Sequence, residues 1–151
     1  MHSRIFILGS HGEQYDPGPE ALFCDLGANG FADSIDDDYD VDASIAMLKK
    51  ALGTAAKWSG KRKFTIVNPE PILAKYYDQF KTVLSELEKV TSDDFANYKT
   101  NWLVAVLMET VQDNDGFHFY CPDFGLITYP ELMRCAKNAT YKIVNTYDFH
   151  A

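Results

Sequence analysis

An apolar run in the second half of the chain, residues 102–108 (WLVAVLM), is the feature that most constrains the fold. A helix that is apolar on every side is usually buried over most of its surface. The run is too short to cross a bilayer, because a membrane-spanning helix needs roughly 20 apolar residues. The sequence therefore predicts a helix over about residues 93–112 that forms the centre of the core.

Periodic apolar patterns and capping residues predict the other helices. Asp42 stands directly before an amphipathic pattern and is a suitable N-cap. Thr128 and Glu131 have the spacing of a capping box, which predicts a short helix after them. The expected helices cover about residues 43–58, 69–87, 93–112 and 128–139. The second and third of these follow each other closely, so we expect them to be antiparallel neighbours.

Short runs rich in β-branched and aromatic residues predict strands where they end at glycine, proline or turn-forming residues. The run at residues 20–26 fits a strand or a short helical turn, and we interpret it as a strand. The expected strands cover residues 4–8, 20–26, 64–67, 116–121, 124–127 and 140–147. Strands and helices do not alternate regularly in this order. The sequence therefore predicts a single α+β domain over residues 1–151, with a mostly antiparallel sheet and about four helices packed mainly on one face.

The composition is that of a cytoplasmic globular protein. A chain of 151 residues with 46% hydrophobic residues can bury a core without metals or disulfides. Its three cysteines, Cys24, Cys121 and Cys135, form no C-x-x-C pair, and so sparse and odd a set fits the reducing cytosol. The apolar stretch after Arg4 is shorter than the core of a signal peptide. We expect a cytoplasmic protein without a membrane segment.

Negative charge is concentrated at the start of the chain. The first 42 residues contain one basic residue, Arg4, and ten acidic residues, whereas the remaining residues carry 13 basic and 12 acidic side chains. The whole excess of the net charge of −8 therefore lies in the first 42 residues. Such asymmetry indicates a partner of opposite sign. It argues against nucleic acid as the partner, because nucleic-acid binding needs a basic surface.

The densest acidic stretch, residues 33–42 (DSIDDDYDVD), carries the main functional hypothesis. We expect a small acidic interaction module that docks a basic protein partner, as an inhibitor, an immunity-type protein or a nucleic-acid mimic does. Tyr39 could serve as an aromatic anchor, because aromatic residues are enriched in interface cores. The expected partner-binding residues are Asp33, Asp36, Asp37, Asp38, Tyr39 and Asp40.

Two other interpretations of this stretch stay open in the sequence. It could be a solvated loop that caps the next helix, or it could bind a hard cation through carboxylate oxygens. An EF-hand loop needs glycine at its sixth position and glutamate at its twelfth. The loops that start at Asp36 and Asp38 have neither residue at these positions. The spacing therefore excludes an EF-hand, while a less regular cation site stays open. We assign no metal site and expect no cofactor.

A small hydrolase-like enzyme is the alternative function, and the sequence leaves open whether the protein is an enzyme. Its candidate catalytic groups are His11, Glu109, His118 and Cys121. A cysteine beside a histidine can supply a thiolate nucleophile, and a buried carboxyl such as Glu109 could act as an acid or base. Residues three apart on a strand point to opposite faces, so a regular strand would separate His118 from Cys121. The alternative therefore requires at least two of the four groups to converge in one pocket.

Overall fold

The computed structural model describes residues 2–10, 12, 14–27, 34–38, 40–112 and 117–150. Within these ranges one mixed sheet of seven strands is accompanied by five α-helices and a short 3-10 helix, η1 (Gly53–Ala55). The strands are β1 (His2–Gly9), β2 (Ser34–Asp37), β3 (Ala56–Ser59), β4 (Lys63–Ile66), β5 (Phe117–Cys121), β6 (Gly125–Thr128) and β7 (Thr140–His150). The helices are α1 (Gly18–Gly27), α2 (Val41–Leu52), α3 (Glu70–Leu87), α4 (Tyr98–Gln112) and α5 (Tyr129–Cys135).

The last strand, β7, organises the sheet. The strand order is β3-β4-β7-β1-β5-β6, and β2 pairs separately with β7. One edge of β7 pairs with β1, and its other edge pairs first with β4 and then, near its C-terminal end, with β2. Among the described strand pairs only β1 and β5 run parallel. The predicted α+β fold with a mostly antiparallel sheet is therefore confirmed.

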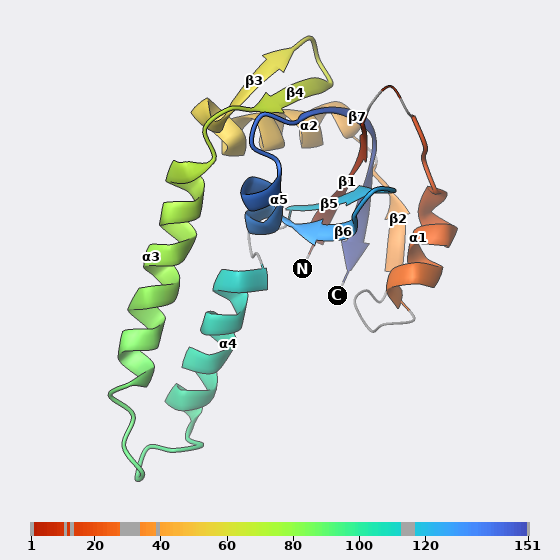
Figure 1. Cartoon of the computed structure of the whole chain (residues 1–151). Coiled ribbons are helices and arrows are strands. Elements are labelled where there is room, and N and C mark those ends of the chain that lie inside the picture. The colour runs from red at the N-terminus through yellow and green to blue at the C-terminus, as the bar shows by residue number, and fades with distance from the viewer. Residues whose placement is uncertain are drawn as a thin grey trace.

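Both faces of the sheet carry apolar residues, because side chains alternate along each strand. In β1, Phe6 and Leu8 belong to the larger cluster, which includes buried residues of α2 and α5 and the first turns of α3. Ile5 and Ile7 belong to a smaller cluster with Leu22 of α1. The helices on the sheet therefore cover both faces, and the described helices outnumber the expected four by one (Figure 1).

The extra helix is α1, which replaces the strand expected at residues 20–26. Pro19 and Glu20 occupy its first turn, where proline and an acidic residue are favourable. The carboxylate of Asp16 accepts a hydrogen bond from the backbone N–H of Gly18 at 3.0 Å, which satisfies one N–H group at the helix start. The strand prediction was wrong because a short apolar run fits a helix turn equally well.

The helix expected at residues 43–58 begins earlier and ends earlier than predicted. Its N-cap is Asp40 rather than Asp42, since the side chain of Asp40 accepts from the backbone N–H of Ala43. α2 stops at Gly53, whose φ of 48° suits glycine but strains other residues. Residues 56–59 then form β3, which pairs with β4. The apolar residues at helical spacing therefore extend beyond Gly53, where the helix ends, and this made the predicted helix too long.

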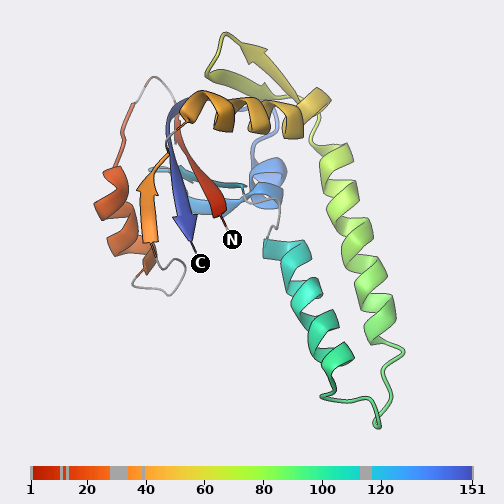
Figure 2. The same ribbon diagram turned by 180° about the vertical axis from the view of Figure 1, so that it is seen from behind.

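The central helix was expected to form the middle of the core, and this prediction was wrong. α4 begins only at Tyr98, and its apolar run packs mainly against α3 rather than against the sheet. The two helices run antiparallel, as predicted, and project from the sheet as a two-helix arm (Figures 1 and 2). Within residues 102–108 only Leu103 is buried, while Trp102 and Met108 are exposed.

Candidate functional site

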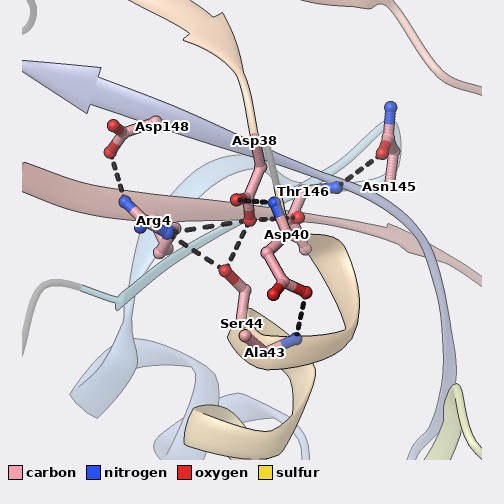
Figure 3. A network of polar contacts seen from close by, with 8 residues as sticks. All are labelled: Arg4, Asp38, Asp40, Ala43, Ser44, Asn145, Thr146 and Asp148. Carbon is pink, nitrogen blue, oxygen red and sulfur yellow. Dashed lines mark hydrogen bonds and ion pairs between the residues drawn. The ribbon is translucent and has the colours of Figure 1, made fainter.

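The acidic stretch turns from the surface into the protein at Asp38. Its side chain is only 4% exposed and lies between β7, α2 and β1 (Figure 3). One carboxylate oxygen, Oδ2, accepts from the hydroxyl groups of Ser44 at 2.5 Å and Thr146 at 2.7 Å. The other, Oδ1, accepts from the backbone N–H of Asp40 at 3.1 Å. Asp38 is therefore fully engaged inside the protein.

Arg4 supplies the opposite charge from the neighbouring strand β1. Its Nε lies 3.6 Å from Oδ2 of Asp38 and donates to the hydroxyl of Ser44 at 3.0 Å. Its Nη1 forms an ion pair with the carboxylate of Asp148 on β7 (Figure 3). One guanidinium thus joins β1, β7, α2 and the segment after β2. The sequence contained a signal for this role, because Arg4 is the single basic residue among the first 42.

The network keeps Asp38 ionised. Burial opposes the charged form, but the hydroxyls of Ser44 and Thr146, the N–H of Asp40 and the charge of Arg4 outweigh it. The pKa of Asp38 therefore lies below its ordinary value. An ionised and buried carboxylate is tolerated only where donors and a counter-charge surround it.

Asp16, in the loop before α1, is held in a similar way. It accepts from the phenol of Tyr147 at 2.7 Å and from the side-chain amide of Asn145 at 3.0 Å. Burial and the hydrogen bond to this carboxylate raise the pKa of Tyr147 to about 12, so the phenol stays a donor at neutral pH. The contacts tie the loop before α1 to β7 and remove Asp16 from the set of free carboxylates.

Three of the expected partner-binding residues are exposed, and two of them are neighbours on β2. Asp36 and Asp37 are exposed on β2, and we call this pair the acidic edge. Asp40 is also exposed, but its carboxylate caps α2. Asp33 and Tyr39 lie outside the described residues. The structure thus divides the predicted set into a buried anchor, a helix cap and an exposed pair.

A shallow hollow adjoins β2 on the side of α1. It has a volume of about 280 Å³ and combines the carboxylate of Glu20 with the half-exposed ring of Phe23. Its remaining lining residues are Pro19, Ser34 and Ile35. Sequence reasoning missed this hollow because residues 20–26 were expected to form a strand, which would not place Glu20 and Phe23 on one helix surface.

The described enzyme candidates lie in three different surroundings. His118 is buried on β5 toward the smaller cluster's face, while Cys121 belongs to the larger cluster on the opposite face. Glu109 is exposed on α4 and lines a groove of about 760 Å³ along the arm. His11 lies outside the described residues. Among the described candidates, neither His118 nor Cys121 lines the groove that contains Glu109.

Cys121 has polar neighbours that the sequence did not indicate. Its Sγ lies 4.0 Å from the hydroxyl of Ser10 and 3.9 Å from the carboxylate of Asp123, and Ser10 donates to Asp123 at 2.6 Å. Burial is the main cause that raises the pKa of the Cys121 thiol. Ser10 and Asp123 also line a crevice of about 520 Å³ beyond the end of β1, whose wall includes Lys63 and Lys142. The crevice could hold a small polar molecule, but a thiol with a raised pKa is a poor nucleophile.

The three cysteines should differ in reactivity. Cys24 and Cys135 are exposed, whereas Cys121 is buried. In a titration of the native protein with Ellman's reagent, we expect two thiols to react promptly and the third only after unfolding in guanidinium. The variant Cys121→Ser should keep both prompt thiols, because only the slow one is removed. Prompt reaction of all three thiols in the native wild type would contradict this assignment.

Comparison of the chain with protein-family models, with curated proteins and with solved structures gives no match. Among the described residues, no helix combines the length and apolarity needed to cross a membrane. The same residues contain no cluster of three or more histidine, cysteine, aspartate or glutamate side chains that could hold a metal ion. The function of this chain must therefore be inferred from its own surface and internal contacts.

Proposed function

We propose that this protein is a small acidic interaction module that docks a basic protein partner at the acidic edge. The observation that carries the proposal is that Asp36 and Asp37 stay exposed while the carboxylate next to them, Asp38, is locked inside. Within the described residues neither Asp36 nor Asp37 forms an ion pair. Their charges are therefore available to a cation from outside.

The internal network supports this role by holding the end of β2 in place. Asp38 follows the acidic edge directly and is bonded to α2, β7 and β1. Backbone pairing places Asp36 opposite Asp148 and Asp37 opposite Tyr147. A docking group that is held in position before binding loses less entropy when the complex forms.

The hollow beside β2 supplies the apolar component that a specific interface needs. Charged groups at an interface mainly raise the association rate and the specificity, while buried apolar and aromatic contacts hold the complex together. Phe23 and Glu20 in this hollow would suit a basic side chain with a long aliphatic stem, such as lysine or arginine. The proposed partner is thus a protein with a cluster of such residues.

Charge reversal of the acidic edge tests the proposal. The double variant Asp36→Lys with Asp37→Lys should recover a basic partner at least about tenfold less well from native cell extract at low salt, because attraction becomes repulsion. Wild-type recovery should also fall as salt is raised, since exposed charges are screened over about 10 Å at 0.1 M. Quantitative mass spectrometry of the captured proteins gives the measurement.

A matched variant separates the site from the overall charge. Glu88→Lys with Asp93→Lys changes the net charge by the same amount at exposed positions beside the far end of the arm. This control should keep wild-type recovery. Equal losses in both double variants would show that only net charge matters, and unchanged recovery in the β2 variant would rule out the acidic edge.

A further inference from the structure

The two-helix arm leaves a large apolar surface open to solvent. Both of its helices and the connection between them contribute exposed aromatic or aliphatic side chains. These residues are Tyr77, Phe95, Tyr98, Trp102, Val104, Met108 and Val111. Their exposed fractions run from 43% for Val104 to 85% for Tyr98. Exposed large apolar residues that occur singly need no explanation, but so many on one pair of helices indicate an interaction site.

The arm has little core of its own. Its base is fixed to the sheet layer, where Tyr76 of α3 packs against Tyr129 of α5 with ring centroids 6.1 Å apart. Beyond Tyr76, the only buried apolar side chain in residues 77–111 is Leu103. An isolated helix pair of this kind gains most of its stability from an apolar face packed against something else. Beyond its base, the described part of the arm therefore has no packing partner other than its own two helices.

Helical spacing puts the open residues of α4 on the side of this helix that faces away from α3. Leu103 marks the buried side. Val104, Met108 and Val111 follow one another at intervals of four and three, which is the spacing of an apolar seam between packed helices. Tyr98 and Trp102 are four residues apart and form a neighbouring row. α4 thus carries a second apolar face beside the one that contacts α3.

This second face is almost free of charge. No charged residue occurs between Lys99 and Glu109, although the whole protein carries −8. Glu109 bounds this face toward the C-terminal end of α4, four residues after Ala105, and it also lines the groove on the flank of the arm with Lys75 and Asp78. An uncharged face does not match the basic partner proposed for the acidic edge. It does allow two copies of an acidic protein to meet without like charges in contact.

The open area fits a stable interface between two copies. An aromatic side chain has roughly 150–250 Å² of surface, so the solvent-exposed part of each of the four exposed rings is on the order of 100 Å² or more. With the three aliphatic side chains, the exposed apolar surface of the whole arm approaches roughly 700–800 Å², and a standard interface buries about 800 Å² on each partner. Permanent interfaces are also rich in aromatic residues and methionine and poor in charge.

We propose that the arm pairs with the arm of a second copy of this chain, so that the four helices complete a bundle around a two-fold axis. In such a dimer the same patch serves both subunits and the association closes at two copies. Antiparallel helix pairs that share an apolar centre are the basic unit of four-helix bundles. The acidic edge lies on the opposite side of the sheet from the arm (Figure 2), so each subunit keeps it free.

The oligomeric state in solution tests the proposal. Sedimentation equilibrium of the full chain should give a mass of twice 17.1 kDa at micromolar concentration. The double variant Val104→Glu with Met108→Glu should shift to the mass of one chain, because four carboxylates would meet at the axis. The matched control Ser85→Glu adds a carboxylate to an exposed position of α3 away from the seam and should remain dimeric.

A cross-linking experiment keeps the test informative if the double variant fails to fold. Ala105 is exposed in the middle of the open face, so Ala105→Cys should form a reducible dimer on mild oxidation. The background would carry Cys24→Ser and Cys135→Ser, and Ser85→Cys should give no such dimer. A wild type that stays monomeric up to about 100 µM would overturn the proposal and leave the patch to a different protein. A seam variant that folds and remains dimeric, or a wild type that forms open-ended aggregates, would overturn it as well.

Discussion

Replacement of Asp38 by alanine should lower the free energy of unfolding by about 3 kcal/mol, because breaking one side of a largely buried ion pair leaves the other groups unpaired. The change removes the acceptor for the hydroxyls of Ser44 and Thr146 and one of the two carboxylates beside Arg4. Arg4 keeps Asp148 and some solvent contact, so its own cost is limited. Urea unfolding followed by circular dichroism at pH 7 measures the difference.

Neighbouring variants separate the buried carboxylate from its exposed neighbour. Asp37→Ala should change the free energy of unfolding by less than about 0.5 kcal/mol, as is usual for a surface substitution. Asp38→Asn keeps an acceptor but loses the charge, and it should fall between the two. An Asp38→Ala protein as stable as Asp37→Ala would show that the network of Figure 3 contributes little to stability.

The same network predicts a dependence on pH. The folded-state pKa of Asp38 is lower than its ordinary value. The stabilising contribution is therefore present above the unfolded-state pKa and is lost as the pH falls through the folded-state value. The difference in the free energy of unfolding between the Asp38→Ala variant and the wild type should therefore become smaller under acidic conditions.

Signals confined to a few adjacent residues predicted the elements well. The capping box of Thr128 and Glu131 is formed in both directions at the start of α5. The strands expected at residues 64–67, 116–121 and 140–147 are present, with ends within a few residues of the expected ones. In these cases the chemistry that sets the backbone conformation lies in the segment itself.

Long-range packing explains the larger errors. The composition of residues 102–108 shows that the helix needs apolar contacts, but it cannot say whether the sheet, α3 or another chain supplies them. Similarly, the composition of residues 33–42 suggests one acidic surface. In the structure, however, Asp38 contacts Arg4, Ser44 and Thr146, which belong to three other elements. Contacts between residues so far apart in the chain are set by the fold, which a local pattern does not encode.

Acidification should destabilise the protein through His118, by up to about 3 kcal/mol between pH 7 and pH 4, at 1.36 kcal/mol for each pKa unit. Burial in the apolar interior lowers the pKa of this imidazole from 6.5 to about 4, although the charge of Glu131 partly opposes the shift. At pH 7 the side chain is neutral in both states and adds no pH dependence. Below about pH 6.5 the imidazole is protonated in the unfolded chain but stays neutral in the folded protein. Folding therefore becomes steadily less favourable until the pH reaches the folded-state pKa of His118.

The variant His118→Phe isolates this contribution from that of the carboxylates, which titrate in both proteins. We expect its free energy of unfolding to fall less steeply than that of the wild type between pH 6.5 and pH 4, while the difference between the two proteins stays constant above pH 7. Guanidinium unfolding at half-unit steps of pH gives both curves. Parallel curves over the whole range would mean that His118 takes up its proton in the folded protein as readily as in the unfolded chain. In that case His118 would have to reach solvent or a counter-charge, and it would regain its place among the candidate acid–base groups.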